Sequence, residues 1–460
     1  MKSTGKVPKG SLCDFFSIYF DQNPIEMMKE QFLKKLQEKK TVVGVIGLGY
    51  VGLPLNLCFV EKGFRSIGFD IDAAKVESLQ SGKSYIKHIV SERIQKALAT
   101  TLFEATTDFS RLKECDAILI AVPTPLNKNR EPEMEYIVKT CEAIYPHLQK
   151  GQLVVLESTT YPGTTVEIVV PILEKSGLKV DKDFYAAFSP EREDPHNPNY
   201  TTETIPKVIG ATSPDGLEAA DAVYKQIVVR TVPVSSTQVA EATKLMENIF
   251  RAVNIALVNE LKVTFMKMGI DIWEVIEAAK TKPFGYMAFY PGPGLGGHCI
   301  PIDPFYLTWK AREFGVNTRF IELAGEINTA MPDFVVQRAM EVLNEFGKPL
   351  KGSKILILGL AYKANVDDDR ESPSYVLMEK LEAKGATVEY NDPYIPVIKM
   401  TREHSQFAGR KSVEITGKYD LMLIATAHDE YRSVDFEKIG IPVVDTRNIV
   451  KIKQAHLFHA

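Results

Sequence analysis

Short apolar runs that alternate with amphipathic stretches constrain the fold of this chain more than any other feature of its sequence. The first series starts at Thr41, and its apolar runs are TVVGVIG, FRSIGFD, DAILIAVPTP, QLVVLEST and FYAAFSP. A second series consists of GSKILILGLAYK, ATVEYNDP, YDLMLIATAHD and IPVVDTRN. Apolar runs of strand length between helical patterns are typical of a parallel sheet built from strand and helix units. We therefore expect an α/β fold with two such domains.

A long helical pattern separates the two series. It reads TQVAEATKLMENIFRAVNIALVNELKVTFMKMGI, contains no proline and has apolar residues every three or four positions. Such a run exceeds the usual length of a helix in a globular protein, so we expect it to bridge two lobes and to supply a subunit contact. On that basis we expect a homo-oligomer, a dimer or larger.

The chain of 460 residues is too long for one core, since single cores stop growing at roughly 250–300 residues. The patterns divide it into an N-terminal extension (1–40), a first α/β domain (41–233), a central helical region with a glycine-rich loop (234–330) and a second α/β domain (331–460). The extension is expected to form an appended helix without a chemical role. Four of its apolar residues can share one helical face: Met27, Phe32, Leu33 and Leu36.

Composition narrows the class of protein. Hydrophobic residues make up 45% of the chain and charged residues 25%, as in ordinary globular proteins, so a fibre and a disordered chain are excluded. The formal net charge of -4 argues against a nucleic-acid partner. No apolar run is long enough to span a membrane, and SLCDFFSIYF carries Asp14 and lacks a cleavage site, so we expect a cytoplasmic location. The five cysteines include no C-x-x-C pair, so neither a disulfide framework nor a metal site is expected.

A glycine fingerprint follows the strand pattern VVGVI directly and opens a helical segment, PLNLCFVEKG. In such fingerprints one glycine permits a tight turn, one lets the backbone approach a pyrophosphate, and one allows close helix packing. Asp70, at the end of FRSIGFD, is placed to accept hydrogen bonds from the adenosine ribose, which favours NAD over NADP. The competing interpretation is that the glycines only mark a turn and the aspartate only ends a strand. The fingerprint consists of Gly47, Leu48, Gly49, Tyr50, Val51 and Gly52.

A cysteine on a loop rich in glycine and proline is the second feature that indicates chemistry. Cys299 lies in PGPGLGGHCIPIDP, a composition that excludes a helix or a central strand. In a chain that binds NAD, an open thiol suits aldehyde chemistry, in which sulfur adds to a carbonyl before hydride leaves. From the residues alone, a nucleophile and a buried loop cysteine are equally open interpretations. The neighbouring His298 is a candidate base, but a loop-shaping histidine is favoured. We expect the other cysteines to pack in the core: Cys13, Cys58, Cys115 and Cys141.

Several motifs, spread between about residue 41 and residue 450, occur together in one order. They are GLGYVGLPL, VPTPLNKNREP, ESTTYPGTT, FSPERED, AEATKLMENIFRAVNIALVNE, GPGLGGHCIPIDPFYL and LGLAYKANVDDDRESP. In this order they resemble the UDP-glucose/GDP-mannose dehydrogenase family. The resemblance implies a Rossmann-type NAD domain, a central long-helix region and a C-terminal Rossmann-like domain that binds the UDP-sugar.

The same resemblance implies the reaction. The family oxidises the C6 alcohol of a nucleotide sugar twice, with NAD and without a metal, through a cysteine thiohemiacetal and a thioester. The wording of the motifs is most similar to the branch that oxidises UDP-N-acetylglucosamine to UDP-N-acetylglucosaminuronic acid for bacterial surface polysaccharides, such as the lipopolysaccharide O-antigen.

The resemblance also implies the catalytic residues. Cys299 matches the nucleophile, and Asp303 matches the acid that works with a bound water near the sulfur. Lys244 and Asn248 match the pair that holds this water and stabilises the developing oxyanion. The two residues are also four positions apart on the predicted helix, so they share a face.

Glu191, in SPERED, matches the first of two family glutamates and is expected to transfer protons and to contact the substrate. The sequence departs from better-known members at the second glutamate, where it has Pro195. The function of that acid must then fall to another group, with Glu191 as the first choice and Arg192 or Glu193 as weaker substitutes. Arg192 is also an expected substrate contact.

Other positions match binding residues of the family. For NAD these are Lys75, Thr124, Thr159 and Arg370, in addition to the fingerprint and Asp70. Both threonines follow strand patterns, and loops at the carboxyl ends of strands line the cofactor crevice. For the UDP-sugar, the matching positions are Glu191, Arg192, Lys244, Asn248, Gly296 and Lys363, with Arg447 as a helper. Lys363 is placed to neutralise the diphosphate.

The sequence leaves rival functions open. A dehydrogenase of UDP-glucose, UDP-N-acetylmannosamine or GDP-mannose would carry the same motifs. A catalytically silent nucleotide-sugar-binding protein and a two-electron 2-hydroxyacid dehydrogenase are two further rivals. No single residue indicates selectivity for an N-acetyl group.

Overall fold

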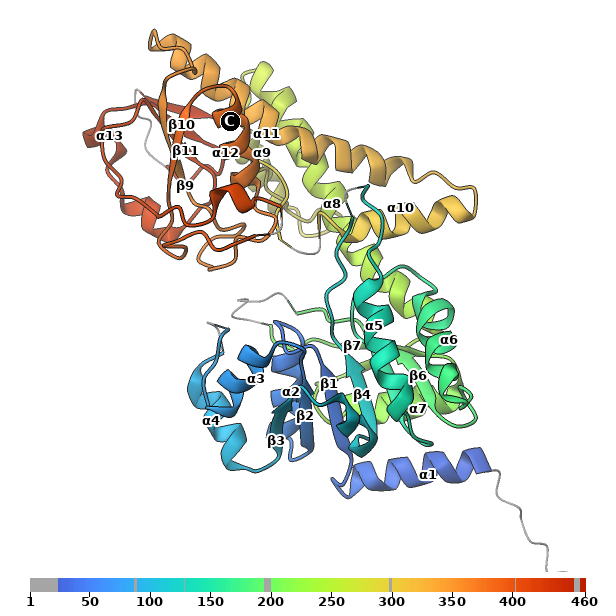
Figure 1. Cartoon of the computed structure of the whole chain (residues 1–460). Coiled ribbons are helices and arrows are strands. Elements are labelled where there is room, and N and C mark those ends of the chain that lie inside the picture. Colours follow the sequence, from blue (N-terminus) through green and yellow to red (C-terminus); the bar gives the residue numbers. More distant parts are fainter. Residues whose placement is uncertain are drawn as a thin grey trace, which may run out of the picture.

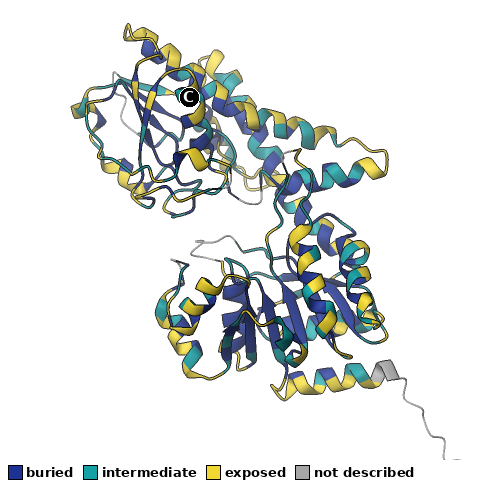
Figure 2. Cartoon of the chain, in the orientation of Figure 1, coloured by how far each residue is buried: buried dark blue, intermediate teal, exposed yellow. Residues whose placement is uncertain are grey.

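The computed structural model describes residues 24–86, 89–127, 129–193, 200–297, 300–401, 403–450 and 456–460. Two lobes, each built on a sheet, are joined by long helices (Figure 1). Burial is concentrated in the sheets and on the inner faces of the helices that cover them (Figure 2). Among the described residues, no helix is both long and apolar enough to cross a membrane.

The N-terminal lobe is built on an eight-stranded sheet with the order β3-β2-β1-β4-β5-β6-β7-β8. All neighbours are parallel except β6 and β7, which are antiparallel. The order 3-2-1-4-5-6 is that of doubly wound dinucleotide-binding sheets. The strands are β1 (Val42–Ile46), β2 (Arg65–Phe69), β3 (Phe103–Thr106), β4 (Ala117–Ile120), β5 (Leu153–Leu156), β6 (Tyr185–Phe188), β7 (Lys207–Ala211) and β8 (Thr231–Pro233).

Helices cover both faces of this sheet, because successive strand residues point to opposite sides. Val155 packs with α2 and α7 on one face, and Leu156 packs with α5 and α6 on the other. The helices are α2 (Gly52–Glu61), α3 (Ala73–Gln80), α4 (Ser91–Ala99), α5 (Glu135–Ile144), α6 (Val170–Leu173) and α7 (Pro214–Tyr224). Cys58, Cys115 and Cys141 are buried, as expected, whereas Cys13 lies outside the described residues.

The N-terminal extension contributes one helix, α1 (Pro24–Gln37), which packs on α7. Phe32 and Leu36 are buried in the core of the sheet, and Lys29 Nζ lies 2.8 Å from the Asp215 carboxylate. Met27 is exposed, in contrast to the expectation that it shares the buried face. Met28 packs against the core instead, because α1 presents position 28 to α7.

The lobes are joined by α8 (Thr237–Lys267), which confirms the long helix predicted from the sequence. It packs against α10 (Asp303–Glu313) and α11 (Arg319–Glu345), and α9 (Ile272–Lys280) lies near its end. The second half of α11 covers one face of the C-terminal sheet, where Val335 and Val342 are fully buried. The expected domain boundary at residue 330 therefore falls inside a continuous helix.

The C-terminal lobe has a five-stranded parallel sheet with the order β10-β9-β11-β12-β13. Its elements are β9 (Lys354–Leu358), α12 (Pro373–Ala383), β10 (Thr387–Asn391), β11 (Leu421–Ile424), α13 (Phe436–Ile439), β12 (Val443–Asp445) and β13 (Leu457–His459). Short 3₁₀ or π turns complete the chain: η1 (Phe109–Glu114), η2 (Tyr145–His147), η3 (Thr165–Val169), η4 (Glu174–Ser176), η5 (Ser405–Phe407) and η6 (Asp429–Ser433). The α/β fold class with two sheet domains and a helical centre is confirmed.

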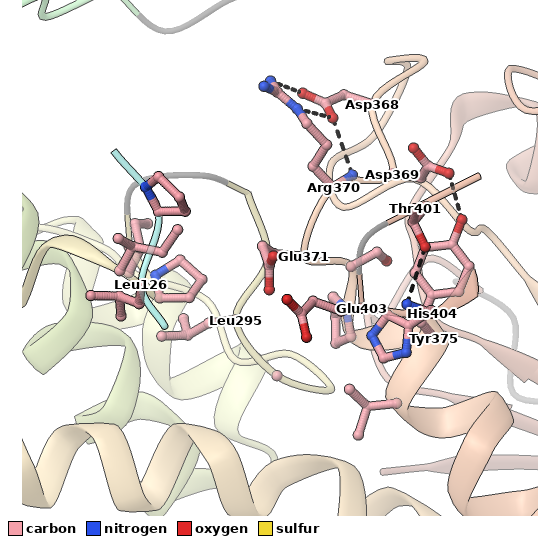
Figure 3. A pocket seen from close by; sticks show the side chains of 18 of the residues that line it. Leu126, Leu295, Asp368, Asp369, Arg370, Glu371, Tyr375, Thr401, Glu403 and His404 are labelled. Carbon is pink, nitrogen blue, oxygen red and sulfur yellow. Dashed lines mark hydrogen bonds and ion pairs between the residues drawn. The ribbon is translucent and has the colours of Figure 1, made fainter. Parts of the chain in front are cut away.

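A cavity of about 1160 Å³ lies between the lobes. Its lining combines Tyr50 of the glycine turn, Leu126 after β4, Ile302 before α10 and the loop from Asp367 to Pro373 after β9. Figure 3 shows Leu126 and Leu295 on one wall, Tyr375 and His404 on the other, and Glu371 and Glu403 between them. Ligand sites of α/β proteins lie at the carboxyl ends of parallel strands, and this cavity occupies that edge of the first sheet.

Candidate active site

The glycine turn between β1 and α2 forms a cradle. Gly47 has φ +90°, and an added Cβ would lie 2.4 Å from the carbonyl oxygen of Ala121. A Cβ on Gly52 would lie 1.8 Å from the carbonyl oxygen of Gly47, so only glycine lets α2 start this close to the turn. Beside Gly49, no atom of the described residues lies within 4 Å of an added Cβ. This open backbone at a helix N-terminus fits the pyrophosphate of a dinucleotide.

Asp70 follows β2 and is buried beside the glycine turn. Its carboxylate accepts hydrogen bonds from the backbone N–H groups of Leu48 at 2.9 Å and Asp72 at 3.0 Å. The Lys75 ammonium lies 3.3 Å from the same carboxylate. Asp70 therefore holds the turn in shape, and the acid and the lysine expected to bind NAD lie together.

Thr124 and Thr159 follow β4 and β5, at the carboxyl edge of the first sheet. The Thr124 carbonyl oxygen accepts a hydrogen bond from the Tyr306 hydroxyl of α10 at 2.7 Å. Ser158 Oγ accepts a hydrogen bond from Val122 N–H at 3.0 Å and donates one to the Val122 carbonyl at 2.7 Å, so it joins the two loops. The two threonines thus stand on loops that are fixed to each other and to α10.

Arg370 extends from the C-terminal lobe to the glycine turn. Its guanidinium carbon lies 4.6 Å from the ring centre of Tyr50, which is within cation–π range. It also pairs with Asp368 at 2.6 and 2.8 Å, as Figure 3 shows, and its carbonyl oxygen accepts from Gly297 N–H at 3.3 Å. One residue therefore contacts the fingerprint, the glycine-rich loop and its own loop.

Lys244, Asn248 and Asp303 form a buried polar cluster at the junction of α8 and α10. Lys244 and Asn248 lie one turn apart on α8, and Asp303 is the first residue of α10. Asn248 Nδ2 donates a hydrogen bond to Asp303 Oδ2 at 2.5 Å. Leu245 and Tyr306, both fully buried, pack between the helices and fix this arrangement.

The environment of Asp303 prepares it for proton transfer. Burial raises the pKa of its carboxyl to about 7, although the nearby Lys244 ammonium, the Asn248 hydrogen bond and Arg251 act in the opposite direction. A carboxyl with this pKa exchanges its proton readily near neutral pH. Its geometry and its titration both suit a general base.

Cys299, the predicted nucleophile, lies outside the described residues, as does His298. The described part of their loop packs tightly against the C-terminal lobe. A Cβ on Gly296 would lie 2.8 Å from the Tyr362 side chain, and Gly297 has φ +83°. Glycine is required at both positions, which brings the loop next to the segment that carries Lys363 and Arg370.

The predicted UDP contacts lie on two sides of this loop. Lys363 is partly buried in the segment after β9. Arg447 follows β12, and its guanidinium lies so close to Gly292 that a Cβ there would be 2.4 Å from Nη1. Burial lowers the pKa of Arg447 to about 10, with Asp445 opposing, so the guanidinium still carries its charge at neutral pH. Its Nε donates to the Ala425 carbonyl at 2.9 Å.

Glu191 lies just after β6 with both carboxylate oxygens engaged. Oε1 accepts from the backbone N–H groups of Arg192 at 2.6 Å and Glu193 at 2.7 Å, and Oε2 lies 3.2 Å from Lys207 Nζ. Burial opposes the charge, but Lys207 and the two N–H groups outweigh it and lower the pKa of the carboxyl. Glu191 is therefore an ionised acceptor.

The neighbours of Glu191 are engaged in the protein. The Arg192 guanidinium pairs with Glu247 of α8 at 2.6 Å and donates to the Pro206 carbonyl at 2.6 Å. The Glu193 carboxylate accepts a hydrogen bond from Thr202, and burial raises its pKa. The substrate role of Arg192 stays a prediction, and Pro195 lies outside the described residues.

The structure brings two groups of predicted residues together. The fingerprint, Asp70, Lys75 and Arg370 gather at the glycine turn, and Lys244, Asn248 and Asp303 at the junction of α8 and α10. Two residues near Glu191 were not predicted from the sequence. Lys207 pairs with the Glu191 carboxylate, and Glu157 pairs with Lys207. No spacing indicates them, because Lys207 and Glu157 lie 50 residues apart in the chain.

Comparisons with known proteins cover almost the whole described chain. Three domain models of the UDP-glucose/GDP-mannose dehydrogenase family match: the NAD binding domain at residues 41–228, the central domain at 238–330 and the UDP binding domain at 356–452.

Individual relatives carry different substrate names. The chain is 35% identical over 404 residues to the UDP-N-acetyl-D-glucosamine 6-dehydrogenase of Pseudomonas aeruginosa, covering 87% of this chain and 94% of the relative. It is 32% identical over 416 residues to the UDP-N-acetyl-D-mannosamine dehydrogenase of Pyrococcus horikoshii, covering 89% and 96%. The solved structure of the Pyrococcus horikoshii UDP-D-ManNAc dehydrogenase matches with a TM-score of 0.83, covering 91% of this chain and 99% of that one.

Proposed function

The chain belongs to the UDP-glucose/GDP-mannose dehydrogenase family, and from that membership we propose that its substrate is UDP-N-acetylglucosamine. It is an NAD-dependent nucleotide-sugar 6-dehydrogenase with an NAD-binding and a UDP-binding domain, which confirms the predicted family, enzyme class and cofactor. The proposed product is UDP-N-acetylglucosaminuronic acid, formed by oxidation of the C6 alcohol in two steps.

One observation carries the proposal for the chemistry. Lys244, Asn248 and Asp303 form a buried cluster, and the residues on either side of Asp303, Ile302 and Pro304, line the cavity between the NAD lobe and the UDP lobe. In the sequence, Asp303 follows Cys299 by four residues, so a nucleophile and a base belong to one short segment. We propose that the sugar C6 binds at this segment.

In the first oxidation, Asp303 accepts the proton of the C6 hydroxyl through an ordered water. Lys244 would be the alternative acceptor only as a neutral amine, after its ammonium had given up a proton. When bound, NAD supplies the hydride acceptor. The Cys299 thiol then adds to the aldehyde carbon: a sulfur–carbon bond forms, the carbonyl π bond opens, and the thiol proton passes through the ordered water to the oxygen, which becomes the hydroxyl of the thiohemiacetal. Lys244 and Asn248 stabilise the negative charge on the oxygen.

In the second oxidation, a second bound NAD would supply the hydride acceptor, and the hydroxyl proton of the thiohemiacetal passes through the ordered water to Asp303, which has returned its first proton to solvent; the product is a thioester. Water attacks the thioester carbon, the bond to sulfur breaks, and Cys299 is regenerated as the sugar acid leaves. The water must lose a proton to a base, and Asp303 is the proposed acceptor because its pKa of about 7 suits this transfer. Glu191, held ionised, orients the substrate or water by accepting hydrogen bonds.

The remaining predicted residues are proposed to bind. Asp70, Lys75, Thr124, Thr159 and Arg370 complete the dinucleotide site around the glycine turn. Lys363 and Arg447 place positive charge on either side of the loop that contains Gly296, where the UDP diphosphate would be neutralised. Arg192 is retained as a weaker candidate, since its guanidinium already pairs with Glu247.

The substrate is tested by counting NADH per sugar across a panel of nucleotide sugars. We expect UDP-N-acetylglucosamine to give the highest kcat/KM and two NADH per sugar acid, with UDP-glucose, UDP-N-acetylmannosamine and GDP-mannose as competitors. A higher kcat/KM with UDP-N-acetylmannosamine would overturn the substrate, and one NADH per sugar would overturn the two-step oxidation. As a control, Cys299→Ser should abolish net acid formation while NAD still binds.

We also propose that the chain forms a homo-oligomer in the cytoplasm and supplies the synthesis of a surface polysaccharide such as the O-antigen. Three large apolar residues on α8 support the oligomer. Met246, Phe250 and Leu257 are 67%, 44% and 51% exposed. They lie four and seven positions apart, so they share one helical face, which we call the α8 apolar face.

A further inference from the structure

Lys207 lies at the active-site edge of the sheet because β7 runs opposite to its neighbours. In the antiparallel pair, Phe188 of β6 faces Gly210 of β7. Extending this register by three residues along both strands brings Glu191 opposite Lys207. The first residue of β7 therefore meets the loop that leaves the carboxyl end of β6. A strand parallel to β6 would carry its first residue to the other edge of the sheet.

The Lys207 ammonium is shared by two carboxylates. Its Nζ lies 2.7 Å from Glu157 Oε2 and 3.2 Å from Glu191 Oε2. The side chain of Lys207 is 4% exposed, that of Glu157 is fully buried and that of Glu191 is 12% exposed. Charges in such surroundings are stable only when they are paired and hydrogen-bonded.

Glu157 occupies the far side of the lysine. It follows β5 directly, and its other oxygen, Oε1, accepts a hydrogen bond from the Tyr224 hydroxyl of α7. Glu157 thus faces the core, whereas Glu191 lies on the other side of the lysine, in the loop that follows β6. Lys207 at the start of β7 is thus held by Glu157 just after β5, which is held in turn by Tyr224 of α7. The other carboxylate beside the Lys207 ammonium is that of Glu191.

A second contact holds the Glu191 loop from the opposite side. The Arg192 guanidinium pairs with Glu247, the residue before Asn248 on α8, and donates to the carbonyl of Pro206, the residue before Lys207. The loop is therefore fixed to the same turn of α8 that carries the catalytic asparagine. Movement of Glu191 relative to Asn248 would require breaking both contacts.

We propose that Lys207, held by Glu157, is a positioning residue that keeps Glu191 ionised and oriented as a hydrogen-bond acceptor. The inference rests on the proposed function of Glu191 in this site. It separates the duties of the two acids: Glu191 accepts hydrogen bonds, and Asp303 transfers protons. With Pro195 in place of the second family glutamate, the inference leaves the proton transfer to Asp303 and not to Glu191.

The experiment measures kcat and KM of the full chain between pH 3 and pH 9 for Lys207→Met, Lys207→Arg and Glu191→Gln, because the lowered pKa of Glu191 places its titration below pH 4.5. Wild-type kcat should fall with one proton below about pH 7, where Asp303 titrates, and with a second proton only at lower pH, where Glu191 titrates. The groups that face Glu191 are Lys207, Glu157, Glu193, Tyr224 and the Arg192–Glu247 pair. Lys207→Met removes the cation nearest to Glu191, so the pH of the second break, at which kcat falls as Glu191 takes up its proton, should rise by about 1–3 units.

Matched variants separate positioning from damage. Lys207→Arg should return the second break toward the wild-type pH, and the exposed Lys179→Met should not move it. Glu157→Gln combined with Lys207→Met removes both buried charges together, so it folds if the single variant leaves too much charge unpaired. If both methionine variants fail to fold, Glu157→Gln alone carries the test. In Glu157→Gln, Lys207 pairs with the Glu191 carboxylate alone and stabilises its charge more strongly. The second break of kcat should therefore move to lower pH than in the wild type.

The outcomes distinguish the inference from the function beneath it. If Glu191→Gln has wild-type activity, the proposed function of Glu191 fails. If Glu191→Gln is impaired but the lysine variants keep the wild-type second break, only the inference fails. Lys207→Met should cause no further loss of kcat in a Glu191→Gln background, and an additional loss of the same size there would show that Lys207 acts elsewhere.

Discussion

Two carboxyl groups of the site are driven in opposite directions by their surroundings. Asp303 is buried at the junction of α8 and α10, and its pKa rises to about 7. Glu191 is also enclosed, but Lys207 and two backbone N–H groups lower its pKa. Opposed shifts of this kind separate the acid–base group from the charged acceptor in many active sites. We therefore expect proton transfer at Asp303 and not at Glu191.

Asp303→Asn should lower kcat by roughly 10²- to 10⁴-fold, the usual contribution of a positioned acid or base. Because the active form of Asp303 is the carboxylate, wild-type kcat should fall as the pH drops below about 7, and this limb should vanish in the variant. A pH series of kcat checks it, with the exposed Asp333→Asn as control. If kcat of Asp303→Asn still fell below about pH 7 as in the wild type, another group would be responsible for this pH dependence.

At the scale of the element, α8 connects the parts of the site. With a rise of about 1.5 Å per residue, its 31 residues span about 46 Å. Near its start, Glu241 accepts hydrogen bonds from Gly163 N–H and Thr165 N–H of the NAD lobe. Further along, Asn259 accepts from Gly292 N–H at the start of the glycine-rich loop and donates to Asn328 of α11. A single helix thus sets the distance between the NAD-binding lobe and the start of the glycine-rich loop.

The attachment of α8 to the NAD lobe should make the stability of the fold depend on pH. Burial raises the pKa of Glu241 from its usual 4.5 to about 7, in spite of its hydrogen bonds to Gly163 and Thr165. The folded chain therefore holds this proton more tightly than the unfolded chain. The resulting stabilisation is complete below about pH 4.5 and is lost as the pH rises through about 7.

Protonation of Glu241 should contribute up to about 3 kcal/mol to the free energy of unfolding, because each unit of pKa shift corresponds to about 1.4 kcal/mol. Glu241→Gln should flatten the part of the stability curve between pH 5 and pH 8, which chemical unfolding at a series of pH values measures. The exposed Glu135→Gln serves as control. An equally steep curve for Glu241→Gln would contradict the assignment, whatever the absolute stability of the variant.

At the scale of the whole molecule, the arrangement is two sheet lobes on one helical connector with the cavity between them (Figure 1). Specific side-chain contacts connect the N-terminal lobe to the rest of the described chain. Arg370 of the C-terminal lobe stacks on Tyr50 of the N-terminal lobe, and Tyr306 of α10 donates to the Thr124 carbonyl. The side of α8 that carries Met246, Phe250 and Leu257 remains exposed along the connector.

Burial of the α8 apolar face by a second copy should give a particle of at least twice the mass of one chain. Leu257→Asp with Met246→Asp should shift the particle toward the monomer, because the charges would have to be desolvated in the contact. Light scattering after size-exclusion chromatography measures the mass, and the exposed Val229→Asp is the control. A monomeric wild type would contradict this proposal and leave the catalytic assignment intact.

The fold was largely predictable from local patterns. The strand runs, the fingerprint from Gly47 to Gly52 and the helix over Thr237–Lys267 are all local signals, and the structure has each of them. The path of α11 through the expected boundary at residue 330 was not predictable, because a helix that serves two cores shows one continuous apolar pattern. Met27 was predicted to share the buried face of α1, but Met28 packs against the core instead. The two methionines are adjacent, and the sequence pattern of a short helix does not decide which of them is buried.

The candidate site was predictable only where a motif or a helical spacing connects its parts. Lys244 and Asn248 are four positions apart, and Asp303 adjoins the glycine-rich loop in sequence. The Lys207 and Glu157 pair has no such connection, since the residues meet only because β7 reverses direction. Arg192 was expected to bind substrate, but its bond to Glu247 could not be read from the chain.

The reversal of β7 has a consequence for how this site can vary. Glu191 and Lys207 are fixed opposite each other by the ladder between β6 and β7, so the connection of residues 192–206 begins and ends at neighbouring points. The middle of such a connection can change in length without moving either end, provided that the contacts of Arg192 with Glu247 and with the Pro206 carbonyl are kept. We therefore expect the charged pair to persist whatever the length of this connection, because the two strands hold its partners and the segment between them does not.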